Sequence, residues 1–288
     1  MTLASCDSRK TAGENPFFTE WDTPHGVPPF DKILPEHFMP AFERGMSLHE
    51  AEIDAITSNK DEATFENTIL AYDDAGQMLA QTELVFGMLC AAETNDRMQA
   101  LQEQAMPLLA AHRDKIRLDD KLFVRVKEVY DRRAALGLDA EQMRLLQKTY
   151  DSFVRAGALL DAEQKARLKE INGQLSLTAV KFGNNILAEN NNFVLELKSD
   201  ELDGLPAGIR DAAREKAQQM GKGDKWVFTL HKPSLIPLLT YSTRRDLREK
   251  IYKAYLNRCN NGDEYDNKQL INDFIRLRTE KAHLLGYP

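Results

Sequence analysis

The stretch that decides the fold covers residues 34–56, LPEHFMPAFERGMSLHEAEIDAI. Phe, Met and Ile residues recur there at positions 38, 42, 46, 53 and 56, and His49 falls in the same series. Spacings of three and four residues place these side chains on one face of an amphipathic helix. Pro35 suits a first helical turn, because the N–H that proline lacks has no intrahelical partner there. The stretch therefore predicts a helix that begins near Leu34.

Helical periodicity continues along most of the chain. The next predicted helix is one continuous element from Phe65 to Cys90, with Thr64 or Asp61 as its N-cap. Asp139 with Gln142 and Asp161 with Gln164 resemble capping boxes, and each opens a further helix. Other helices are predicted at about 97–112, 120–136, 206–220, from 235 onward, and 267–285.

The periodicity changes at two short apolar segments, FVLEL at 193–197 and WVFTL at 226–230. Their β-branched and aromatic residues favour strands, and the two segments are expected to pair antiparallel. No fixed-period repeat is present, which argues against a solenoid. The sequence thus predicts an all-α fold, an irregular multi-helix bundle with a small two-stranded antiparallel insertion.

Prolines and Gly26 make residues 1–30 irregular, and residues 31–288 form the predicted helical part. The chain has 38 Lys and Arg against 45 Asp and Glu, a net charge of −7. Such a balance gives no reason to expect nucleic acid as a partner. No apolar run approaches the ~18 residues that a transmembrane helix needs. The three cysteines, Cys6, Cys90 and Cys259, form no Cys-x-x-Cys pair, and Cys90 is expected in the core.

The chain contains six histidines, the residues that most often bind zinc or act as catalytic bases. A zinc peptidase of the His-Glu-x-x-His type needs two histidines at i and i+4 on one helix face. His49-Glu50 begins like this motif, but position 53 is Ile, so His49 is interpreted as a histidine on the helix surface. No Gly-x-Ser-x-Gly, Walker A or Gly-x-Gly-x-x-Gly motif occurs either. We therefore expect no catalytic residue and no metal ligand in this chain, and the substrate-binding residues stay unknown.

Several segments, in order along nearly the whole chain, resemble the start of a bacterial peptidyl-dipeptidase of the thimet oligopeptidase family of zinc metallopeptidases (M3). They are Asn15–Phe17, Pro29–Ile33, His37–Phe42, Thr64–Ile69, Phe153–Ala158, Leu277–Ala282 and Leu284–Tyr287. Each segment is weak alone, and their order makes the resemblance specific.

The resemblance implies a mostly helical, two-lobed enzyme whose channel admits short peptides as substrates. It also implies one Zn²⁺, held by a His-Glu-x-x-His motif and a further Glu in a C-terminal catalytic domain beyond Pro288. Residues 31–288 would then be the N-terminal lobe, which walls the channel and is inactive alone. The full-length protein would release C-terminal dipeptides from short peptides.

Alternatives remain open at this point. The chain is also compatible with a truncated helical peptide-binding or scaffold protein without catalysis. An oligopeptidase of the same family that cleaves internal bonds is a third reading. Within Thr64–Ile69, a helix start with a packed phenylalanine is favoured over a peptide contact.

Leu3-Ala4-Ser5-Cys6 resembles a bacterial lipobox, in which Cys6 would be lipidated after signal cleavage. A signal peptide needs ~7–15 apolar residues upstream of this site, so the hypothesis requires a longer reading frame. The irregular segment 1–30 would then be a lipoprotein tether. With such a signal the protein is expected in the periplasm or anchored to the envelope, and otherwise in the cytoplasm.

Overall fold

The computed structural model describes residues 15–288, so Cys6 and its lipobox lie outside the described residues. The described chain forms two compact units. The first unit runs to Leu177 and includes Thr279–Pro288, and the second comprises Thr178–Arg278. Both boundaries fall inside helices, α7 (Ala162–Asn192) and α11 (Lys268–Leu284).

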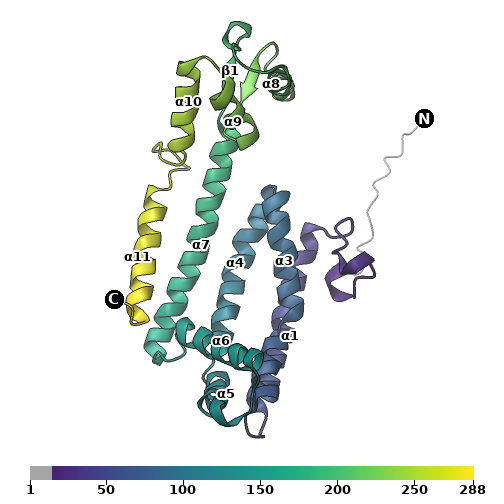
Figure 1. Ribbon diagram of the computed structural model, residues 1–288, viewed down its shortest axis with the longest axis vertical. Helices are drawn as coiled ribbons and strands as arrows, with labels where there is room; N and C mark the ends of the chain where they lie inside the picture. Colours follow the sequence, from purple (N-terminus) through teal and green to yellow (C-terminus); the bar gives the residue numbers. More distant parts are fainter. Residues whose placement is uncertain (1–14) are drawn as a thin grey trace, which may run out of the picture. The chain divides into compact units, whose positions relative to one another are not determined.

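The first unit begins with three short 3-10 helices, at Pro16–Phe18, Pro24–Gly26 and Pro35–His37. The helices that follow are α1 (Phe38–Ser58), a π-helical segment (Phe65–Leu70), α2 (Ala71–Asp74), α3 (Gln77–Ala92), α4 (Asp96–Arg117), α5 (Asp120–Asp131), a 3-10 turn (Arg133–Ala135) and α6 (Ala140–Ala156). Figure 1 shows α1, α3 and α4 side by side, and α1 contacts both of the others.

The second unit contains β1 (Leu195–Leu197), a 3-10 turn (Ser199–Glu201), α8 (Ala207–Gln219), β2 (Trp226–Phe228), α9 (Lys232–Tyr241) and α10 (Arg245–Leu256). The strands pair antiparallel, with Leu195 opposite Phe228 and Leu197 opposite Trp226. The predicted insertion is therefore confirmed, with shorter strands than expected. The all-α class with a small antiparallel sheet is confirmed as well.

The predicted face of the first helix is confirmed. Phe38, Phe42, Ile53 and Ile56 of α1 are buried, and they divide between two apolar clusters of the first unit. A third cluster, which includes Leu197, fills the second unit. Burial of apolar area is the main favourable term in folding, so these clusters hold each unit together.

Both predicted capping boxes form. The side chain of Asp139 accepts a hydrogen bond from the amide of Gln142, whose own side chain accepts from the amide of Asp139. Asp161 and Gln164 make the same reciprocal pair at the start of α7. Each box satisfies amides that the first turn of a helix leaves without partners.

The prediction of a single helix from Phe65 to Cys90 is wrong. The backbone leaves the helical conformation at Ala75 and Gly76, and Gly76 has φ +78°. The amide of Gly76 donates a hydrogen bond of 2.7 Å to Glu52 Oε2 on α1. A Cβ at Gly76 would lie 2.9 Å from His49 Nδ1. A contact with another helix therefore fixes the break, and glycine fits it because it adopts positive φ without strain.

Two smaller expectations also change. The helix expected at 120–136 ends as an α-helix at Asp131 and continues as a 3-10 turn. Cys90 is half-buried at the edge of a cluster instead of inside the core. Among residues 15–288, no helix combines the length and the apolar character needed to cross a membrane.

Candidate functional site

Two histidines that are far apart in the sequence meet between α1 and α4. Nε2 of His112 lies 3.0 Å from Nδ1 of His49. His112 is only 5% exposed, and its Nδ1 lies 3.5 Å from Glu50 Oε1. Glu50 Oε2 in turn lies 2.7 Å from Lys115 Nζ. His49 is therefore half-buried against another helix, which corrects its interpretation as a surface histidine.

Burial lowers the pKa of both histidines, because it penalises the charged imidazolium. The proximity of His112 lowers the pKa of His49 further, and Glu52 and Glu50 oppose this effect. For His112, Glu50 raises the pKa and Lys115 lowers it. Both rings are thus held toward the neutral form, which lets one ring donate a hydrogen bond to the other.

The histidine pair does not fit a zinc site. Catalytic zinc has three protein ligands around one point. Glu50 approaches Nδ1 of His112, whereas His49 approaches Nε2 on the other side of the same ring. Among residues 15–288, no group of three or more His, Cys, Asp or Glu side chains is placed to hold a metal ion. The pair is a structural contact between α1 and α4.

Thr64 and Asn67 shape the start of the helical segment that follows. Thr64 Oγ1 accepts a hydrogen bond of 3.1 Å from the backbone amide of Asn67. Asn67 Oδ1 accepts one of 2.8 Å from the backbone amide of Thr64. Arg125 donates to the same Asn67 oxygen at 3.1 Å. Phe65 is 5% exposed, so the interpretation as a helix start with a packed phenylalanine is confirmed.

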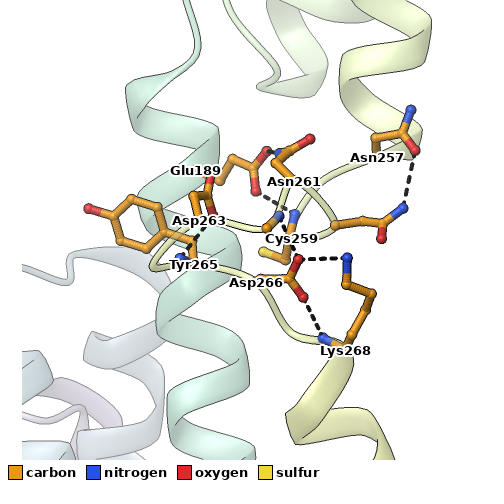
Figure 2. Close-up of polar contacts among 10 residues, drawn as sticks. Glu189, Asn257, Cys259, Asn261, Asp263, Tyr265, Asp266 and Lys268 are labelled. Carbon is orange, nitrogen blue, oxygen red and sulfur yellow. Dashed lines mark hydrogen bonds and ion pairs between the residues drawn. The ribbon is translucent and has the colours of Figure 1, made fainter.

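Glu189 of α7 holds the loop between α10 and α11 in the second unit (Figure 2). Its carboxylate accepts hydrogen bonds from the amide of Cys259 and from the side chain of Asn261. Within the loop, the carboxylate of Asp266 accepts hydrogen bonds from the backbone amides of Gly262, at 2.7 Å, and Lys268, at 2.9 Å. The Lys268 amide is the largest cause that lowers the pKa of Asp266.

Cys259 occupies an unusual backbone position in this loop, with φ +55°. The residue is 3% exposed, and burial raises the pKa of its thiol to about 11. A thiol with so high a pKa is protonated at neutral pH and is a poor nucleophile. Cys259 and Glu189 therefore have a structural role, because their hydrogen bond stabilises the conformation of the loop.

The loop and α11 lie within the segment that matches a known family. Residues 238–288 match the family model described as "Peptidase family M3". The chain is 36% identical over 275 residues to the dipeptidyl carboxypeptidase of Escherichia coli (strain K12). The matched region covers 95% of this chain and 40% of that protein. The resemblance to peptidase family M3 is confirmed. Since the chain spans only 40% of the length of these M3 relatives, most of the relative lies outside the matched region.

Two other M3 relatives show which members of the family the chain resembles more. The dipeptidyl carboxypeptidase of Salmonella typhimurium is 34% identical over 95% of this chain and 40% of its own length. Oligopeptidase A of Escherichia coli is 26% identical over 92% of this chain and 40% of its own length. The chain is therefore more similar to these two dipeptidyl carboxypeptidases than to that oligopeptidase.

The partners of His49 and Glu189 could not be predicted from the sequence. His112 lies 63 positions from His49, and Cys259 lies 70 positions from Glu189. No local spacing marks such pairs. The positive φ of Cys259 also has no sequence signal, because Asn, Asp and Gly are the residues usually found there.

Proposed function

We propose that this chain is the N-terminal, non-catalytic part of a zinc-dependent peptidyl-dipeptidase that releases C-terminal dipeptides from short peptides. One observation carries the proposal: the 36% identity to a dipeptidyl carboxypeptidase over 95% of the chain. The lower identity to oligopeptidase A, 26%, favours dipeptide release over internal cleavage.

In this proposal the zinc ligands and the catalytic base belong to the part of the relatives that this chain does not span. The 288 residues contain no His-Glu-x-x-His motif, which supports that division of labour. The helices of this part wall the substrate channel, limit the size of the peptide and exclude water from the reaction. Lipidation of Cys6, with a location at the cell envelope, belongs to the same proposal.

Exposed apolar side chains of the second unit support a contact with further chain. Tyr252 and Leu256 stand four residues apart on α10, line one hollow with Leu239, and are 50% and 61% exposed. Large exposed apolar side chains that gather on a surface mark interaction sites. We assign them to the interface with the catalytic part.

Metal analysis and a peptidase assay of the 288-residue chain test the proposal. After dialysis the chain is expected to hold no stoichiometric zinc and to leave short peptides intact, since it lacks a pair of histidines at i and i+4. About one tightly bound zinc per chain, or release of dipeptides by the chain alone, would overturn the assignment as the non-catalytic part.

A further inference from the structure

A cavity of about 590 Å³ in the first unit is lined by a concentration of cations. Arg113 and Arg117 enter it from α4, and Arg144, Lys148 and Arg155 enter it from α6. The two helices contact each other, and both can be followed in Figure 1. A volume of this size lies within the range of small-molecule sites, about 300–1,000 Å³.

The cations are arranged as two stripes that face one space. Arg113 and Arg117 stand four residues apart on α4, as Arg144 and Lys148 do on α6. Residues four apart are neighbours on a helix surface, and like charges at that spacing destabilise the helix. The apolar residues Leu146 and Phe153 of α6 are fully buried, whereas these cations are exposed. Each pair of like charges therefore disfavours its own helix.

Acidic side chains offset only part of this charge. None of the five cations forms an ion pair within 4 Å anywhere in the described part of the chain. Two carboxylates, Asp114 and Asp151, line the cavity, against six cations when Lys281 is included. Since the whole chain carries a net charge of −7, a local excess of positive charge is contrary to its overall balance.

Three lining residues, Asp114, Asn172 and Lys281, are joined by hydrogen bonds at the wall of the cavity. Asn172 donates to Asp114 Oδ1 at 2.8 Å and accepts a hydrogen bond of 2.6 Å from Lys281 Nζ. These contacts join α4, α7 and α11 within the first unit. The wall is therefore fixed by hydrogen bonds.

Arg113 donates through Nε to the backbone oxygen of Leu109 at 3.2 Å, and Arg117 contacts the hydroxyl of Tyr72. Each guanidinium carries five N–H donors, so further donors remain for a ligand.

We propose that this cavity binds a small multivalent oxyanion, a molecule that carries two or more phosphate or carboxylate groups. Guanidinium groups match such oxyanions because their planar forks donate paired hydrogen bonds. Two stripes on facing helices suit a ligand with charge at both ends better than a single monovalent ion. This proposal rests on the residues that line the cavity and does not depend on the peptide chemistry proposed above.

Calorimetric titration of the 288-residue chain with pyrophosphate and with citrate, in about 0.15 M chloride to screen surface charge, tests the proposal. Saturable binding of one molecule per chain is expected. A preference for pyrophosphate assigns phosphate groups and a preference for citrate assigns carboxylates, and both support the site. Absence of saturable binding of either probe overturns it.

Variants of the cations on α4 and on α6 provide a second test of the proposal. Arg144→Gln with Lys148→Gln, and separately Arg113→Gln with Arg117→Gln, are expected to weaken binding at least about tenfold, because each removes two charge-assisted donors. The Arg144 and Lys148 variant should keep or raise the Tm of the unliganded chain, since repulsion is relieved. Arg210→Gln with Lys250→Gln removes the same charge from exposed positions of the second unit and should bind like the wild type. Equal weakening in this control, or wild-type affinity in both cavity variants, contradicts the proposal.

Discussion

Nε2 of His112 lies 3.0 Å from Nδ1 of His49, across the contact between α4 and α1. The contact needs at least one ring with an unprotonated nitrogen, because two imidazolium rings could only donate to each other. The pair therefore couples the packing of α1 on α4 to the protonation state of two side chains.

Stability is expected to fall as the pH drops below the usual histidine range. Burial lowers both pKa values below 6.5, so the folded chain binds fewer protons than the unfolded chain. The contribution of the neutral pair is complete above about pH 6.5 and is lost as the pH falls through the folded pKa values. Thermal unfolding at pH 7.5 and 5.5 measures the drop in Tm.

The variant for this test is His49→Gln with His112→Gln, which is expected to show a smaller drop in Tm between the two pH values. His283→Gln is the control, because His283 is exposed and should leave the drop unchanged. An identical pH dependence in all three proteins would show that the pair does not titrate on unfolding.

Gly76→Ala is expected to destabilise the chain by about 1–3 kcal/mol. The φ of +78° strains any residue with a Cβ, and the new atom would lie 2.9 Å from His49 Nδ1. Urea denaturation followed by circular dichroism measures the change.

Gly87→Ala is the matched control on α3, since a Cβ there meets no atom within 4 Å. This exposed helical position should tolerate alanine or gain up to about 1 kcal/mol from its helix propensity. Equal stability of the two variants would remove the reason given for the helix break at Gly76.

Glu189→Ala is expected to loosen the loop between α10 and α11 and to cost about 2–4 kcal/mol. It removes the carboxylate that accepts hydrogen bonds from Cys259 and Asn261, and hydrogen bonds to a charged group contribute about 1.5–3 kcal/mol each. Faster hydrogen exchange at the Cys259 amide, together with urea denaturation, measures the effect.

The control is Glu264→Ala, an exposed residue of the same loop, which should change stability by no more than about 0.5 kcal/mol. If Glu189→Ala behaves like this control, the carboxylate does not hold the loop.

Local signals were sufficient to predict much of the fold. The capping boxes at Asp139 and Asp161 and the buried face of α1 follow from side chains within one or two turns. Gly76 shows where such reasoning ends, because a hydrogen bond to Glu52 on another helix overrides the local periodicity. The basic residues at Arg113 and Arg144 were not predicted as a site, because the cavity that joins them depends on how α4 packs on α6.

The proposed role of this chain, as the non-catalytic part of a peptidyl-dipeptidase, can be tested in an active enzyme. Its most direct test is a fusion in which residues 1–288 replace the matched region of the Escherichia coli dipeptidyl carboxypeptidase. Matched short peptides with a free or an amidated C-terminus are then digested, and the products are identified by mass spectrometry. The account predicts release of C-terminal dipeptides from the free peptide, poor cleavage of the amidated peptide, and loss of activity with a chelator. Internal cleavage of both peptides at equal rates would contradict it.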